Sequence, residues 1–82
     1  MLIDHTQAPQ EFEGQLYDQR HGGPFDRGAA DSWYHRPPEP HYYVGATYMS
    51  ERVNCEPGTQ AHAEYMAGYE FNERSGGKKD WF

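Results

Sequence analysis

The chain has 82 residues, of which seven are Lys or Arg and thirteen are Asp or Glu, so its formal net charge is −6. This balance argues against direct binding to free DNA or RNA, because phosphate contacts need clustered basic residues. The length allows one domain, and a domain this small buries only about 60% of the surface of its unfolded chain. Leu, Ile, Val and Phe together number nine, whereas Phe, Tyr and Trp number thirteen. We therefore expect a small core made of aromatic rings.

The sequence favours a cytoplasmic location. Residues 1–3 are apolar, but Asp4 follows at once, so the apolar core of a signal peptide is not formed. No apolar run approaches the length that spans a bilayer, so no membrane partner is expected. Cys55 has no second cysteine to pair with in the chain, which favours a reducing compartment.

Residues 1–23 are weakly patterned. Phe12, Gly14 and Leu16 alternate weakly with polar residues, which fits a short edge strand, but the segment has no clear period and a disordered arm fits at least as well. Glycines at 22 and 23 then form a joint. We expect a flexible N-terminal arm over residues 1–23 and a small helical domain over residues 24–82.

The first helix is expected over residues 24–35. Pro24 suits the first turn of a helix, and the residue before Pro37 is pushed out of helical geometry. Phe25, Ala29 and Trp33 recur every four residues and predict the buried face, with Asp31 on the outside. Gly28 costs the helix about 1 kcal/mol relative to Ala, which indicates that another backbone packs closely against it.

The connection between the helices is expected to be extended and then irregular. Three prolines within residues 36–41 predict polyproline character. The Tyr, Val and Thr residues of the segment 42–54 favour strands. Gly45 and Ala46 could form the two-residue turn of a short hairpin, or the segment could be an irregular loop.

The second helix is expected over about residues 60–74. Thr59 is the expected N-cap, and Gly76 fits the end of the helix. The apolar residues Ala61, Tyr65 and Tyr69 share a face on which Gly68 lies, and we expect Gly68 to meet Gly28. The sequence thus predicts a mainly α fold, a small antiparallel helix pair, with these structural residues: Phe25, Gly28, Trp33, Tyr65, Gly68, Tyr69 and, folding back from the C-terminal tail, Trp81.

Catalytic and metal-binding motifs are weak. His35 and His41 are separated by five residues, and Cys55 and His62 by six, whereas zinc sites are usually built from closer pairs. The segment 62–64 has the H-x-E order of zinc deaminases but lacks their downstream P-C-x-x-C. We expect no enzyme activity, no cofactor and no bound metal, with a zinc-stabilised module as the alternative.

Acidic and aromatic side chains are the expected means of binding a partner. Tyr42 and Tyr43 follow the prolines, and Tyr is enriched at protein interfaces. The alternative is that these rings cover the core, and one ring could do each, since neighbouring residues of an extended segment face opposite ways. The expected partner-binding residues are Asp31, Tyr42, Tyr43, Glu64, Glu70 and Glu73.

Four segments carry a resemblance to a group of short phage and prophage proteins. These segments are FDRGAADSWY at 25–34, PHYY at 40–43, EYMAGYE at 64–70 and KDW at 79–81. The resemblance implies a phage or mobile-element origin and brings no activity with it. A more distant similarity is to ribosome modulation factor, through Gly28, Pro40, Tyr42, Gly68 and Tyr69. That family is basic and binds ribosomal RNA, whereas this chain is acidic.

Together these observations predict a small non-enzymatic protein that binds a host protein or protein–nucleic acid complex. In this interpretation the acidic side chains take the place of phosphate and inhibit a nucleic-acid-handling or defence machine. The alternative, which the second resemblance implies, is a ribosome-associated modulation or hibernation factor.

Overall fold

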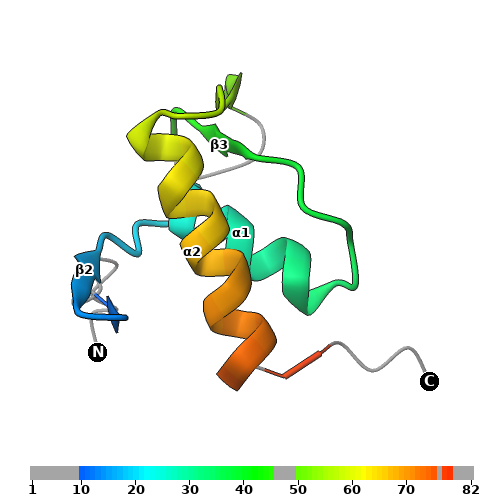
Figure 1. The fold of residues 1–82 in the computed structure, drawn as a ribbon. Coiled ribbons are helices and arrows are strands. Elements are labelled where there is room, and N and C mark those ends of the chain that lie inside the picture. The colour runs from blue at the N-terminus through cyan, green and yellow to red at the C-terminus, as the bar shows by residue number, and fades with distance from the viewer. Residues whose placement is uncertain (1–9, 46–49, 76, 79–82) are drawn as a thin grey trace, which may run out of the picture.

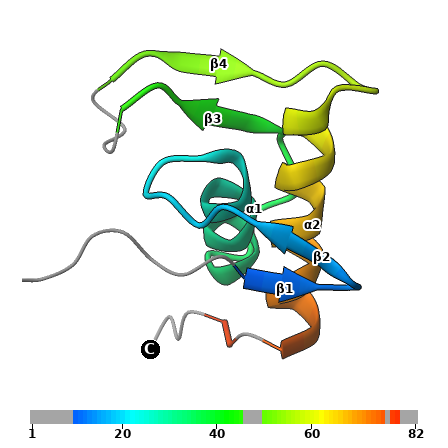
Figure 2. The ribbon, with the colours of Figure 1, turned by 90° about the vertical axis from the view of Figure 1, so that its left-hand side faces the viewer.

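A computed structural model describes residues 10–45, 50–75 and 77–78. Two helices cross near the centre, and two small hairpins lie beside them (Figures 1 and 2). The fold is therefore an α+β mixture, and the prediction of a mainly α protein is wrong. Its elements in chain order are β1 (Gln10–Phe12), β2 (Gln15–Tyr17), α1 (Pro24–Trp33), β3 (His41–Tyr43), β4 (Arg52–Asn54) and α2 (Gln60–Ser75).

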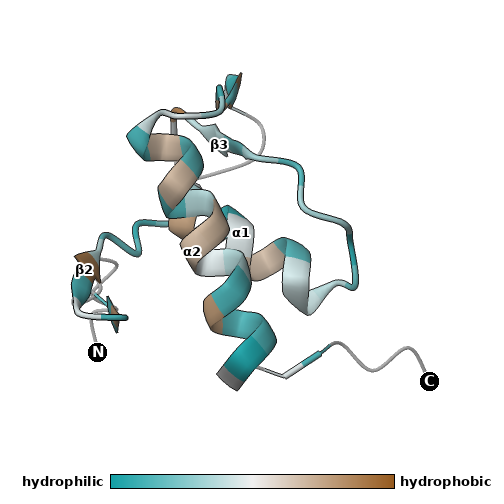
Figure 3. Cartoon of the chain, in the orientation of Figure 1, coloured by the Kyte–Doolittle hydropathy of each residue, from teal (hydrophilic) through white to brown (hydrophobic). Residues whose placement is uncertain are grey.

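Both helices begin where the sequence predicts. Pro24 opens α1, and the hydroxyl of Thr59 accepts a hydrogen bond of 3.3 Å from the backbone N–H of His62, which makes Thr59 the N-cap of α2. The expected cap at residue 76 lies outside the described residues. Apolar positions of α2 gather in its first half, and the second half is more hydrophilic (Figure 3).

The helices meet at two glycines, which confirms the prediction that Gly28 packs against the second helix around Gly68. A Cβ at Gly28 would overlap the carbonyl oxygen of Tyr65 and lie 2.8 Å from the backbone nitrogen of Tyr69. A Cβ at Gly68 would overlap the carbonyl oxygen of Phe25 and lie 2.9 Å from its Cα. Backbone therefore touches backbone at this crossing, and no side chain larger than hydrogen fits.

The helices do not form the predicted antiparallel pair. Phe25, at the start of α1, lies against Gly68, whereas Ser32, near its end, accepts a 2.9 Å hydrogen bond from the side chain of Asn72. Phe25 also lies beside Phe71, and Asp31 contacts Tyr65, so the contacts do not run in one direction along the two helices, and Figure 1 shows them crossing. The extended segment after α1 returns toward the start of that helix, where the backbone N–H of Tyr43 donates to the carbonyl oxygen of Gly22. The five residues 36–40 can span about 17 Å, which is enough to run back along α1, whose ten residues rise about 15 Å.

The segment predicted as an arm contains the hairpin of β1 and β2. Its strands pair antiparallel, with Phe12 opposite Gln15. The two turn residues, Glu13 and Gly14, both have positive φ angles, of 53° and 78°, as the tight turn of a two-residue hairpin requires. The ring of Phe12 lies edge-on to that of Phe71 on α2, with centroids 5.7 Å apart. Residues 1–9 lie outside the described part of the chain.

The second hairpin has a longer connection than the sequence predicts. Tyr43 of β3 pairs with Arg52 of β4, and the backbone N–H of Val44 still donates to the carbonyl oxygen of Glu51 at 2.9 Å. The strands are therefore joined beyond Gly45, and the predicted two-residue turn at Gly45 and Ala46 is wrong. Residues 46–49 lie outside the described part.

The core is aromatic, as the composition predicts. Phe25 and Tyr65 are the buried apolar side chains of the described residues, at 2% and 0% exposure. Trp33 is 40% exposed, so its prediction as a buried residue is wrong. The buried face of α1 instead consists of Phe25, Gly28, Asp31 and Ser32. Half of that face is polar, so the four-residue spacing of apolar residues did not identify the buried face of α1 correctly. Trp81 lies outside the described residues.

Candidate functional site

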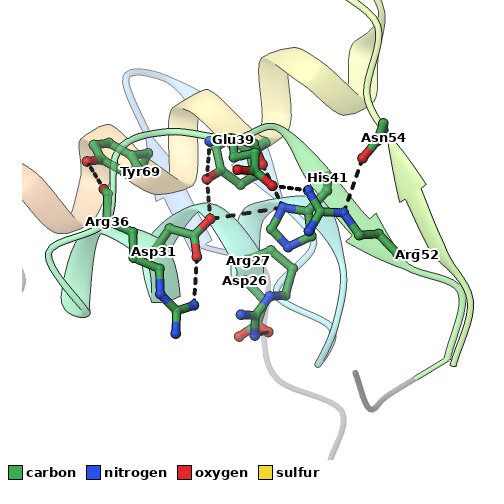
Figure 4. A network of polar contacts seen from close by, with 10 residues as sticks. Asp26, Arg27, Asp31, Arg36, Glu39, His41, Arg52, Asn54 and Tyr69 are labelled. Carbon is green, nitrogen blue, oxygen red and sulfur yellow. Dashed lines mark hydrogen bonds and ion pairs between the residues drawn. The ribbon is translucent and has the colours of Figure 1, made fainter. Parts of the chain in front are cut away.

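A buried carboxylate joins three parts of the fold. Asp31, on α1, is only 3% exposed. Its Oδ2 accepts a hydrogen bond from the hydroxyl of Tyr65 on α2, and its Oδ1 accepts one of 3.3 Å from Arg36. The Nδ1 atom of His41, on β3, lies 4.0 Å from Oδ2. Figure 4 shows Arg36 and His41 beside the carboxylate of Asp31, and with the Tyr65 hydroxyl they provide the compensation that a buried charge requires.

The hydroxyl of Tyr65 acts as both donor and acceptor. It donates to Asp31 and accepts the backbone N–H of Glu39 at 2.9 Å. Burial, reinforced by the hydrogen bond to Asp31, raises the pKa of Tyr65 well above its ordinary value of 10.0. The hydroxyl therefore keeps its proton and serves as a permanent donor near neutral pH.

Further contacts fix the extended segment between α1 and β3. The hydroxyl of Tyr69 donates to the carbonyl oxygen of Arg36, and His41 Nδ1 lies 2.6 Å from the carbonyl oxygen of Glu39. The side chain of Glu39 forms an ion pair with Arg52 on β4. The hydrogen bond from Arg52 lowers the pKa of the Glu39 carboxyl. The segment is thus attached to both helices and to the second hairpin.

Two adjoining hollows lie beside this network, and together we call them the arginine groove. The smaller has a volume of about 190 Å³ and the larger about 680 Å³. Both are lined by Arg27, Arg36 and Tyr43. The smaller is completed by Asp31, Pro37, Glu39, His41 and Arg52, and the larger by His21, Asp26, Ala30 and Tyr34.

Arg27 is the least satisfied cation of the groove. Its Nε atom is buried and has no hydrogen-bond partner in the part of the chain that the structure describes. Its nearest carboxylate, that of Asp26, is 4.0 Å away and already accepts the backbone N–H of Gly22 at 2.9 Å. The guanidinium lies over the ring of Tyr43, 5.7 Å from its centroid. The side chain is therefore held in place, although its buried Nε–H donates to no described group.

The predicted partner-binding residues are not brought together. Asp31 points inward and is buried. Tyr43 lines the arginine groove, whereas Tyr42 has the opposite orientation that strand alternation gives its neighbour. The prediction that one of these rings contacts a partner while the other covers the core is therefore consistent with the strand geometry.

The three glutamates of α2 do not form one patch. Nine residues, or about two and a half turns, separate Glu64 from Glu73, which places them on opposite sides of the helix. Glu70 forms an ion pair with Arg74, and Glu73 forms one with Lys78. The hydrogen bond from Lys78 lowers the pKa of Glu73, and the hydroxyl of Ser32 donates to the same carboxylate at 2.7 Å. Two of these charges are thus already compensated.

Sequence reasoning missed the arginines that line the groove. Arg27, Arg36 and Arg52 come from α1, the extended segment and β4, and no sequence spacing links them. The one available signal was the polar pair Asp31 and Ser32 inside a helix that must bury one face. A polar pair at the i+3 and i+4 positions from Gly28 could have indicated a buried polar network.

Comparison of the chain with protein-family models, with curated proteins and with solved structures finds no match. The two resemblances stated from the sequence therefore stay predictions. Among the described residues, no group of three His, Cys, Asp or Glu side chains is arranged to hold a metal ion. No helix in the described ranges is both long enough and apolar enough to cross a membrane. Burial raises the pKa of the Cys55 thiol, which disfavours the reactive thiolate.

Proposed function

We propose that this chain is a small non-enzymatic protein that binds a macromolecular complex in the cytoplasm of a host cell, and that the arginine groove is its contact surface. The observation that carries the proposal is the composition of the groove. Tyr34, Tyr43, Arg27 and Arg36 line the larger hollow. Tyr and Arg are the residue types that dominate the binding energy of protein interfaces.

The surroundings of the groove support a protein partner. Tyr34 remains 38% exposed, and its neighbour Trp33 remains 40% exposed, so large rings are available at the end of α1. The walls are held by the network around Asp31 and by the stacking of Arg36 over Tyr34, 5.1 Å from the ring centroid. A surface that is ordered before binding loses less conformational entropy when the partner docks.

The glutamates that α2 carries on different sides are the second part of the proposal. The net charge of −6 supports an inhibitor that takes the place of nucleic acid on a basic machine, with Glu64, Glu70 and Glu73 on α2 as the charged residues. None of the three lines the groove, so the glutamates and the groove can be tested separately. Charge-driven binding weakens with salt, since screening shortens the range of exposed charges.

The test is capture of the tagged protein's partners from bacterial lysate after nuclease treatment, read by mass spectrometry. We expect the wild type and Leu16→Ala to retain one complex, and Tyr34→Ala to lose it. Leu16 is a matched control because it is 66% exposed on β2, outside the groove. If Glu70→Lys with Glu73→Lys loses the complex while Tyr34→Ala retains it, these glutamates form the interface and the groove proposal fails. Capture of ribosomal proteins that nuclease removes would favour the ribosome-associated alternative.

A further inference from the structure

We propose that the arginine groove contains a carboxylate-binding site centred on Arg27. Its ligand is an Asp or Glu side chain, or a C-terminal carboxylate, of the partner protein. The biological ligand rests on the proposed function, whereas the site itself can be measured on the isolated protein. Three observations carry this inference: an unused donor, the charge of the lining and the fixed geometry of the guanidinium groups.

The unused donor is the Nε–H of Arg27. It is buried without a partner among the described residues, and such groups are rare in folded proteins because leaving them unpaired is costly. The arginine lines both hollows of the groove, so a ligand in either of them can lie beside this side chain. A ligand oxygen that accepts from Nε would form a charge-assisted hydrogen bond.

The charge of the lining favours a singly charged anion. The smaller hollow is lined by Arg27, Arg36 and Arg52 against the two carboxylates of Asp31 and Glu39. In the larger hollow, Arg27 and Arg36 face the carboxylate of Asp26. Because Arg27 and Arg36 line both hollows, the groove as a whole has three arginines and three carboxylates. Arg36 and Arg52 are each paired with one of these carboxylates, whereas Arg27 lies 4.0 Å from its nearest one. One added carboxylate can pair with Arg27, whereas a phosphate, which is nearly doubly charged, would be repelled more strongly by the neighbouring carboxylates.

Contacts with neighbouring side chains fix the positions of the guanidinium groups of Arg27 and Arg36. The guanidinium of Arg36 donates a hydrogen bond of 3.3 Å to Oδ1 of Asp31 and lies over the ring of Tyr34. Arg27 covers the ring of Tyr43. Figure 4 shows both guanidinium groups extending to the same side of α1, away from α2. A carboxylate between them would therefore meet cations that need little rearrangement, and Arg suits this task because its donors match the planar carboxylate.

The test is a titration of the full chain with sodium acetate at constant ionic strength, followed by the ¹H–¹⁵N signals of the arginine Nε–H groups. We expect acetate to shift the Arg27 signal and to saturate it, and inorganic phosphate at equal ionic strength to bind more weakly. Arg27→Gln should weaken acetate binding by about tenfold, which corresponds to about 1.4 kcal/mol. The matched control is Arg74→Gln, because Arg74 is an exposed arginine of α2 that lies outside the groove.

The peptide acetyl-Ala-Asp-Ala-amide, compared with its Asn counterpart, tests the proposed source of the carboxylate. Binding of the Asp peptide alone, at the Arg27 signal, supports a side-chain carboxylate. Equal acetate binding by wild type and Arg27→Gln, or tighter binding of phosphate, overturns the proposal. If Arg27→Gln fails to fold, the wild-type Nε–H signal still decides, since an Arg27 signal that acetate leaves unmoved refutes the site. Acetate binding with no partner captured from lysate would instead contradict the proposed function alone.

Discussion

At the scale of single residues, Asp31 organises the polar interior. One carboxylate contacts Arg36, His41 and Tyr65, which belong to the extended segment, β3 and α2. A buried charge is tolerated only while its partners are in place, and removal of one partner leaves the penalty of burial without its compensation. The network therefore determines which packing of the three segments is stable.

Tyr65→Phe tests this network. The substitution removes the donor to Asp31 and the acceptor for the backbone N–H of Glu39, while the buried ring stays. We expect the free energy of unfolding to fall by about 1–3 kcal/mol, measured by urea denaturation. Tyr42→Phe is the control, because the Tyr42 hydroxyl forms no hydrogen bond within the described ranges, and its effect should be near zero. Equal effects of the two substitutions would contradict a structural role for the Tyr65 hydroxyl.

Two exposed ion pairs give the protein an acid-sensitive stability. Arg52 lowers the pKa of Glu39, and Lys78 lowers that of Glu73, both from the ordinary 4.5. The unfolded chain therefore takes up protons at these groups before the folded chain does. Stability is fully present above the unfolded pKa of about 4.5 and declines as the pH falls through the folded values. Urea midpoints measured from pH 7 to pH 3 should fall at the acid end, and Glu39→Gln should make the fall shallower. A midpoint that rises with acidification would refute this account.

At the scale of elements, the crossing of α1 and α2 depends on Gly28 and Gly68. An Ala in place of Gly normally strengthens a helix by about 1 kcal/mol. Here the added methyl group would overlap the backbone of the facing helix, so the local gain is outweighed by the clash. Overpacking of this kind cannot be relieved by a rotamer change, since backbone atoms are what the methyl group meets.

Gly28→Ala should therefore destabilise the fold by about 3 kcal/mol or more. Thermal unfolding followed by circular dichroism measures the effect. Ala63→Gly, at an exposed position of α2, should cost only about 1 kcal/mol from helix propensity. A higher melting temperature for Gly28→Ala would show that the backbones do not touch at this point.

The elements also show what the sequence can predict and why. The helix starts at Pro24 and Gln60 follow from local proline and N-cap chemistry, and the glycine contact follows from the cost of Gly inside a helix. The crossing of the two helices depends on contacts between residues far apart in the chain, which no local signal contains. The hairpin of β1 and β2 has strands of only three residues each, too short for a clear period. The sequence did not predict the inward orientation of Asp31, because a carboxylate is more often exposed to solvent than buried in a core.

At the scale of the whole molecule, the chain combines a net acidic charge with a groove in which three arginines meet three carboxylates. Three of its five arginines line the smaller hollow, although the net charge is −6. The net charge governs the long-range approach to a partner, whereas the groove supplies short-range contacts that orient a bound group. A partner for this surface should therefore present a basic face with a carboxylate-bearing segment near it.

The arginine groove is expected to bind a carboxylate of a partner protein. The most direct measurement compares the partners that tagged wild type, Arg27→Gln and Arg74→Gln retain from nuclease-treated lysate, by quantitative mass spectrometry. We predict that wild type and Arg74→Gln retain the same complex, and that Arg27→Gln retains about tenfold less of it. Equal retention by folded Arg27→Gln would contradict the claim and would leave the groove without a part in binding.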